Sequence, residues 1–476
     1  MSNGRREALP RLPAKLEAPS GVVPAIRADF TSVPTAQEIG TSMHQSLPAR
    51  LAGAALLAVS YSVAAQQPMT NTIPVQTLAE PAKPEVREIG FKVKTRGGFS
   101  IESDDGSAGF DIEGRTVFDV NYFDGFYNQG GDGATGSESE LRRARFGFNG
   151  WYSKDWNYTF LVNLAEDTRS IDETATTIDT AMVQYTGFKY ADVTVGRFKR
   201  PVSLDILTSS NWQPLTELAY IWELAPANDI TKFSLQASKL FEFGNKSGLV
   251  YQLALSDAYA EDEPTKSGKD HYALNGRLVY TPWVDKGRVL HLGLSYGDQN
   301  PGDGATTNVR SRLGVHGISK LTLAASQPID SDSQYGLEAA GIFGPMSFQA
   351  EYLSRSIGGA EGSGDIDVSG YYLTGTYTLT GESRGYKRKD GRFDKIVPAN
   401  HRFGAIELVA RIQSATVSPQ GGTEVSADAY TVGANWYPIR AVKLALDVTQ
   451  ATVDGLDTGA AGDSGRAVVG RVQWVF

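Results

Sequence analysis

The chain has 476 residues, a net charge of −9 and no cysteine. The lack of cysteine excludes thiol catalysis, a disulfide framework and Cys-ligated zinc. Tyr, Phe and Trp make up 10% of the residues and glycine occurs 51 times, a composition typical of large barrels with many turns and aromatic girdles. A chain of this length can hold several soluble domains or one large barrel.

The N-terminal part contains an apolar stretch at residues 51–65 that ends in small residues. The stretch is shorter than the roughly 18 apolar residues of a membrane-spanning helix, and its pattern is that of a secretory signal peptide cleaved after Ala65. We therefore expect residues 1–42 to be an upstream extension without structure and residues 43–65 to be the signal peptide. Residues 66–96 contain four prolines and are expected to be an extended periplasmic linker.

From residue 108 onward, apolar and polar residues alternate along short segments. A two-residue period with one apolar face indicates β-strands. Short connections alternate with long connections that are rich in Gly and Asp. The pattern predicts sixteen strands near residues 108–122, 141–153, 156–166, 177–187, 190–199, 231–243, 247–259, 270–284, 287–298, 334–343, 346–357, 366–380, 403–415, 424–436, 441–453 and 464–476.

The last segment ends in Trp474-Val475-Phe476, and its apolar face finishes on an aromatic residue, as in the closing strand of outer-membrane barrels. Sixteen strands enclose an aqueous lumen. The sequence therefore predicts that residues 97–476 form an all-β fold, a transmembrane antiparallel β-barrel of about sixteen strands. The soluble alternatives are paired sandwiches or a propeller, and the sequence shows no blade-length repeat.

Signatures of enzymes are missing from the sequence. Five histidines are scattered without metal-ligand spacing, and there is no Walker loop. The Gly-Asp-Gly triplets at 131–133 and 302–304 lack the distant glutamate of a calcium loop. We therefore expect no catalytic activity, no cofactor, no metal site and no nucleic-acid partner.

Two clusters of basic residues lie on predicted strands. The second strand opens with residues 141–145, and alternation directs Arg143 and Arg145 into the lumen, whereas Arg142 lies at the rim unless the pleat breaks there. The fifth strand ends in Arg197-Phe198-Lys199-Arg200, and alternation places Lys199 on the lipid side. A charge at bilayer depth costs about 2–4 kcal/mol, so we expect a bulge, or a position above the apolar band, to remove it from lipid.

Two further clusters lie in long connections. One is a short cationic row in the loop 299–333, formed by Arg310, Arg312, His316 and Lys320. The other crowds the periplasmic connection 381–402, which includes Arg384 and is either a solvated tail or a plug folded into the barrel. Any single cluster could line a water-filled pore or contact lipid headgroups. Together, inward rows of Arg and Lys favour an anion path, and the planar Arg guanidinium suits phosphate oxygens.

Five segments resemble motifs of the phosphate-selective porin O and P family. They are Leu141–Arg145, Gly196–Leu204, Leu379–Tyr386, Glu407–Arg411 and Asn435–Tyr437. The resemblance implies a homotrimeric sixteen-stranded barrel in the outer membrane. It also implies that two extracellular loops, 200–230 and 299–333, and the periplasmic turn 381–402 fold inward. The constriction arginines of the family correspond to Arg142 and Arg143, and its pore lysine corresponds to Lys199.

The chain also departs from the family pattern. Two arginines that follow the third loop in the family are absent from Glu217-Leu218 and from residues 226–229, and the cationic row in 299–333 is shorter. Both departures argue against high phosphate selectivity.

We therefore predict a passive porin in the outer membrane of a Gram-negative bacterium, embedded in outer-membrane lipid and conducting small anions such as phosphate or polyphosphate. The predicted anion-binding residues are Arg142, Arg143, Arg145, Lys199, Arg200, Arg310, Arg312, Lys320 and Arg384. Two alternatives remain: a general porin with weak selectivity, and a non-conducting receptor or adhesin that acts through its long loops.

Overall fold

The computed structural model describes residues 90–94, 99–128, 136–165, 177–225, 231–257, 271–400, 402–459 and 462–476. The predicted upstream extension, the signal peptide and most of the predicted linker lie outside these residues. In the described part of the chain, no helix is both long and apolar enough to cross a membrane.

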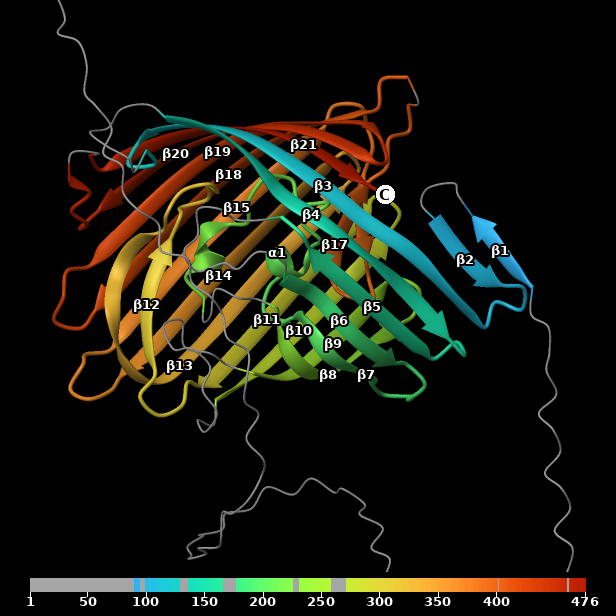
Figure 1. The fold of residues 1–476 in the computed structure, drawn as a ribbon, viewed down its shortest axis with the longest axis horizontal. Coiled ribbons are helices and arrows are strands. Elements are labelled where there is room, and N and C mark those ends of the chain that lie inside the picture. Colours follow the sequence, from blue (N-terminus) through green and yellow to red (C-terminus); the bar gives the residue numbers. More distant parts are fainter. Residues whose placement is uncertain are drawn as a thin grey trace, which may run out of the picture. The chain divides into compact units, whose positions relative to one another are not determined.

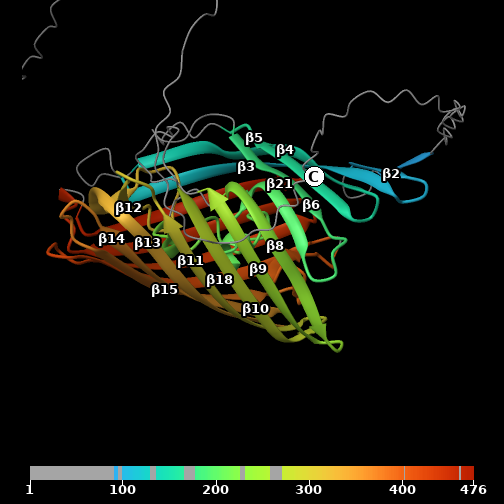
Figure 2. The same ribbon diagram turned by 90° about the horizontal axis from the view of Figure 1, so that it is seen from below.

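Sixteen antiparallel strands of the described residues form a closed wall, in which each strand pairs with the next and the last pairs with the first (Figures 1 and 2). The predicted sixteen-stranded barrel is thereby confirmed. The wall strands are β3 (Ala108–Gly125), β4 (Gly136–Tyr152), β5 (Trp156–Asn163), β6 (Thr177–Tyr185), β7 (Asp192–Lys199), β8 (Thr231–Phe243), β9 (Ser247–Asp257), β10 (Tyr272–Asp285), β11 (Arg288–Asn300), β13 (Leu321–Phe343), β14 (Met346–Gly359), β15 (Ile366–Thr378), β18 (Ala405–Pro419), β19 (Val425–Ile439), β20 (Val442–Asp454) and β21 (Ser464–Val475).

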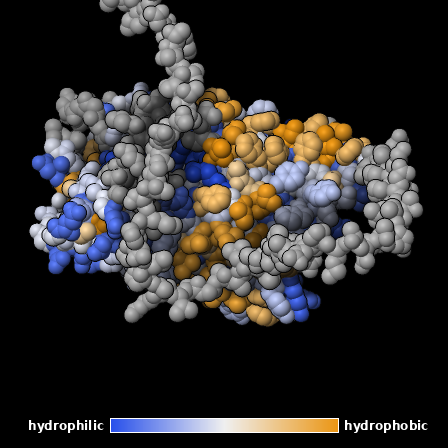
Figure 3. Space-filling view, turned by 60° about the horizontal axis from the view of Figure 1, so that its bottom comes forward, coloured by the Kyte–Doolittle hydropathy of each residue, from blue (hydrophilic) through white to orange (hydrophobic). Residues whose placement is uncertain are grey.

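The two faces of the wall differ in polarity because side chains alternate along each strand. On β21, Val472 and Trp474 are 49% and 52% exposed on the outside, whereas Arg471 and Gln473 are 4% and 2% exposed on the inside. Figure 3 shows hydrophobic side chains gathered over a broad area of the surface, with hydrophilic ones concentrated at one end. This is the arrangement that lipid outside and water inside require.

The structure corrects some predicted boundaries. Strand β4 begins at Gly136, five residues before the predicted start. Strand β13 begins at Leu321 instead of 334, because its first part pairs with the short strand β12 (Thr306–Ser311) inside the predicted loop 299–333. A hairpin of β1 (Phe91–Lys94) and β2 (Phe99–Ser103) pairs with the start of β3, so the end of the predicted linker is a strand.

Two further segments between wall strands have structure of their own. The connection between β7 and β8 contains α1 (Leu204–Leu207) and the 3-10 helix η1 (Tyr220–Glu223). The periplasmic connection after β15 contains the two-stranded sheet of β16 (Arg384–Lys387) and β17 (Arg392–Ile396). Strand β17 contacts α1, so this connection is a plug folded into the barrel, one of the two arrangements that its length and charge allowed.

One side of the lumen is filled by an apolar core. Tyr220 and Ile221 of η1 and Leu313 of the loop after β12 are fully buried. They belong to one cluster with wall residues of β15, β18 and β19, such as Val368 and Ala427. The water-accessible path is therefore displaced toward β3–β8, where the basic residues of β4 and β7 are found.

Candidate functional site

The segment 200–225, here called the inner loop, is held inside the barrel by the buried carboxylate of Glu351 on β14. This carboxylate accepts hydrogen bonds from the backbone N–H groups of Leu204 and Asp205 at 2.8 and 3.0 Å and from Trp222 Nε1 at 3.2 Å. The hydroxyl of Tyr372 on β15 donates to the same carboxylate at 2.5 Å. A single wall residue thus binds both limbs of the inner loop.

Other inward residues of the wall bind the middle of the inner loop. Asp447 accepts a hydrogen bond from the N–H of Thr216 at 2.6 Å, and Asn435 donates to the carbonyl oxygen of Pro214 at 2.6 Å. Lys443 donates to the carbonyl oxygen of Gln213 at 2.8 Å. These bonds satisfy backbone groups that would otherwise be buried without partners, and they fix the loop as one boundary of the pore.

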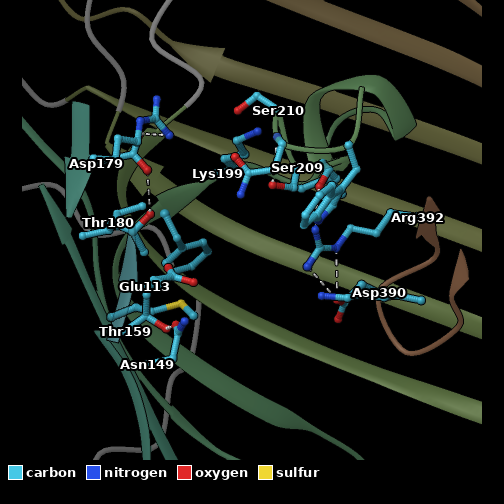
Figure 4. Close-up of a pocket in the computed structure, with 18 of the residues that line it drawn as sticks. Glu113, Asn149, Thr159, Asp179, Thr180, Lys199, Ser209, Ser210, Asp390 and Arg392 are labelled. Atoms are coloured by element: carbon cyan, nitrogen blue, oxygen red, sulfur yellow. Dashed lines mark hydrogen bonds and ion pairs between the residues drawn. The ribbon is translucent and has the colours of Figure 1, made fainter. Parts of the chain in front are cut away.

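Two cavities lie between the inner loop and the wall. The larger cavity has a volume of about 730 Å³ and is lined by the plug and by inward residues of β3–β7. The smaller cavity has a volume of about 300 Å³ and lies toward the extracellular loops. Both cavities are lined by Arg145, Asp179, Lys199 and Ser210. These four residues therefore lie where the two cavities meet, a position here called the constriction. Figure 4 shows Asp179 across the larger cavity from Lys199 and Ser210.

The constriction carries two cations and one carboxylate. Arg145 Nη1 lies 2.6 Å from Asp179 Oδ1, so the charge of this arginine is largely compensated. Lys199 Nζ donates to the carbonyl oxygen of Ile206 in α1 at 2.6 Å. Lys199 reaches the lumen because it is the last residue of β7 and follows Gly196, whose φ of 132° interrupts the regular pleat. Lys199 therefore faces the lumen and not the lipid, as expected from the cost of a charge at bilayer depth.

Arg142 turns inward at a bulge in β4, since the register with β3 shifts between the pairs Val117–Arg143 and Phe118–Leu141. Its guanidinium binds Glu217 of the inner loop with two contacts of 3.1 Å. Arg471 lies 3.0 Å from the same carboxylate. Burial opposes ionisation of Glu217, but the surrounding Arg142, Arg143 and Arg471 hold its pKa well below the usual range.

Among the cations that line the cavities, Arg115, Arg143, Lys199, Lys387 and Lys395 have no ion pair with any carboxylate of the described residues. Arg115 donates to Ser210 Oγ at 2.7 Å and to the side-chain oxygen of Asn211 at 2.5 Å, both of them neutral groups. The smaller cavity as a whole is lined by seven Lys and Arg residues and three carboxylates, which leaves it strongly positive; the cations are Arg142, Arg143, Arg145, Arg197, Lys199, Arg312 and Lys320.

The remaining predicted residues are divided between lining and structural positions. Arg312 and Lys320 line the smaller cavity. Arg200 and Arg310 are not among the residues that line either cavity, and Arg200 is buried. Arg384 is also outside the linings, where it pairs with Glu407 of β18 and donates to the carbonyl oxygen of Trp212 at 2.7 Å. Its contacts therefore attach the plug to the wall and to the inner loop.

Sequence reasoning missed four charged residues of the site. Arg115 and Arg471 lie on inward positions of predicted strands, so the alternation of apolar and polar residues could have shown that both point into the lumen. Asp179 lies at a register shift between β5 and β6 that alternation does not predict. Glu217 was noted only as a departure from a family motif, and its ion pairs with two distant strands have no local signature.

Comparisons with known proteins agree with this architecture. The family described as "Phosphate-selective porin O and P" matches residues 110–476. Porin O of Pseudomonas aeruginosa is 32% identical over 412 residues, covering 81% of this chain and 92% of that protein. The solved structure of an anion-selective porin from Comamonas acidovorans has the same fold, with 13% identity and a TM-score of 0.50 over 78% of this chain and all of that one. The chain therefore belongs to the phosphate-selective porin O and P family and is a porin of the Gram-negative outer membrane.

Proposed function

We propose that the pore conducts small anions in preference to cations, with phosphate or polyphosphate as the main permeant class. The observation that carries the proposal is the set of lining cations without carboxylate partners among the described residues, which includes Arg115, Arg143 and Lys199 along the path between the two cavities. Lys199 lies at the constriction itself, and Arg115 and Arg143 lie on its two sides. An anion can therefore move from one cation to the next along the path.

The electrostatics of the narrow lumen favour this direction of selectivity. Field lines from lining charges are focused where low-dielectric walls surround a thin water column, and the local anion concentration rises. Several binding sites of moderate strength let an ion enter and leave, whereas one tight site would retain it. Arg143 can offer two parallel N–H donors to phosphate oxygens, whereas Nη1 of Arg115 already donates to Ser210 and Asn211. The transport is passive and includes no covalent step.

Planar-bilayer recordings of the purified protein test this proposal. In a KCl gradient, we expect a reversal potential that corresponds to anion preference. Added phosphate should then reduce the chloride current, because it occupies the same cations for longer. A reversal potential of the opposite sign contradicts the anion proposal and leaves the porin assignment intact.

A weakly selective porin is the second candidate, and the ion pairs of the site favour it. Glu217 compensates Arg142, and Asp179 compensates Arg145, so only part of the positive charge attracts ions. In that case both ions should pass, and phosphate should cause no measurable reduction of the chloride current at concentrations up to about 100 mM. This is roughly the ionic strength at which exposed charges are largely screened.

Replacing Glu217 by glutamine should raise the anion preference about threefold or more, because the charges of Arg142 and Arg471 then lose a compensating carboxylate. In the wild type the low pKa of Glu217 keeps this carboxylate ionised, so the difference in preference between the wild type and Glu217→Gln should persist as the pH falls from 7 toward 4.5. Permeability ratios from reversal potentials measure both effects. Asp457→Asn on an exposed outer loop is the matched control, and an equal change in both variants would contradict the role of Glu217.

We also propose that the protein assembles as a homotrimer and that export removes the chain up to Ala65. Family membership supports the trimer, and the apolar stretch 51–65 supports the cleavage. Mass spectrometry of the protein from outer membranes reports both the mass of the assembly and the N-terminal residue.

A further inference from the structure

The two ends of the barrel differ in the sign of their charge. The six short turns at the periplasmic end, 153–155, 186–191, 244–246, 286–287, 344–345 and 440–441, contain five Lys or Arg residues and one acidic residue. Three outer loops, 360–365, 420–424 and 455–463, contain five acidic residues and no Lys or Arg. The periplasmic end therefore carries a ring with about one cation in each turn.

Three cations of this end lie over aromatic rings. Lys246 Nζ is 4.7 Å from the ring centre of Trp283, and Lys189 Nζ is 4.9 Å from that of Tyr190. The guanidinium of Arg402, just before β18, is 5.3 Å from the ring centre of Phe403. The rings of Tyr190, Trp283 and Phe403 are 63%, 44% and 60% exposed, so each pair is accessible from outside.

These pairs lie on the lipid side of the wall. Trp283 is paired with Leu290, which is exposed together with Leu292 and Leu294 on the outer face of β11. Phe403 accepts a hydrogen bond through its carbonyl oxygen from the exposed Trp436, and Tyr190 accepts one from Tyr251. None of the three cations is among the residues that line the two lumen cavities. Outward aromatic rings at the end of a barrel mark the depth of the lipid headgroups.

We propose that the periplasmic rim binds anionic phospholipid headgroups of the inner leaflet of the outer membrane at Lys189–Tyr190, Lys246–Trp283 and Arg402–Phe403. The ring anchors the glycerol region of the lipid, and the cation above it binds the phosphate. Among the described residues, Lys189 and Arg402 have no ion pair, and Lys246 has one exposed pair with Asp285 at 3.1 Å.

The expected preference follows from the attraction of basic residues to an anionic membrane surface. Each Lys or Arg close to the surface raises the affinity of the protein for anionic lipid about fivefold. Phosphatidylglycerol should therefore occupy the site near Trp283 about fivefold more than phosphatidylcholine. The two lipids share a phosphate, so a difference between them reports the net charge of the headgroup.

Tryptophan quenching by brominated lipids tests the proposal on the mature protein in bilayers. Quenching by brominated phosphatidylglycerol and phosphatidylcholine is compared, and Trp283→Phe isolates the contribution of Trp283. We expect the fivefold preference in the wild type and a ratio near one in a variant that combines Lys189→Gln, Lys246→Gln and Arg402→Gln. Arg466→Gln is the matched control, because Arg466 is equally exposed at the opposite rim, and its ratio should equal that of the wild type.

Three results would overturn the proposal. The first is equal quenching by both lipids in the wild type, and the second is an unchanged preference in the triple variant. The third is loss of the preference on adding inorganic phosphate but not KCl of equal ionic strength, since the rim would then bind the free anion. A heat-modifiable shift in electrophoresis shows that each variant retains the barrel.

Discussion

Replacing Lys199 by glutamate is expected to lower the anion-to-cation permeability ratio by about tenfold or more. The substitution replaces a basic side chain by an acidic one at the position that both cavities share. Two unit charges 4 Å apart interact with about 4 kcal/mol at an effective dielectric constant of 20, and a tenfold change in the ratio requires only about 1.4 kcal/mol. Reversal potentials in a KCl gradient measure the ratio.

Lys286→Glu provides the control for this substitution. Lys286 lies in an exposed turn at the periplasmic end and does not line either lumen cavity, so the same change in net charge should alter the ratio less than twofold. Equal effects of the two substitutions would mean that the overall charge of the protein sets the selectivity. In that case the constriction would not be the selective element.

Replacing Glu351 by alanine is expected to release the inner loop from the wall. The substitution removes the acceptor for two backbone N–H groups, Trp222 Nε1 and the Tyr372 hydroxyl, all of them buried. Each buried donor left without a partner costs about 1–3 kcal/mol. Because Lys199 is bonded to the α1 turn that Glu351 holds, we expect noisier single-channel currents, closure at lower voltage and a lower anion preference.

A variant on the same strand separates this role from a general effect on β14. Ser347 also points inward, but its hydroxyl contacts Thr376 of the neighbouring wall strand at 2.7 Å and has no hydrogen bond with the inner loop. Ser347→Ala should therefore keep the current noise and closure voltage of the wild type. Glu351→Gln retains one acceptor oxygen and should lie between the two. Quiet wild-type currents in Glu351→Ala would show that the other wall contacts suffice to hold the loop.

The wall could be predicted from the sequence because alternation is a local property. Each strand such as β21 repeats one apolar and one polar position, and this repeat depends only on neighbouring residues. The inward direction of Arg143 and Arg145 followed from the same repeat. The short strands β12, β16 and β17 were missed, since their pairing is decided by contacts inside the lumen and not by an apolar face.

The contacts of the site could not be predicted for a related reason. Glu351 binds Leu204 across 147 positions of the chain, and Arg471 binds Glu217 across 254. No periodicity links residues at such separations. The inward turn of Arg142 depends on a bulge in β4, whose position follows from the register with β3. Family resemblance singled out Arg142, Arg143 and Lys199, but it gave no partner for any of them.

The apolar core formed by the inner loop, the loop after β12 and strands β15, β18 and β19 has a consequence for evolution. The part of the lumen that this core fills behaves like the interior of a water-soluble protein, where apolar side chains are closely packed. Substitutions within the core are constrained by shape, whereas those at the residues that line the two cavities are constrained by charge. The protein can therefore acquire a new solute preference through a few polar exchanges on one arc of the cylinder without disturbing the packing that keeps it narrow.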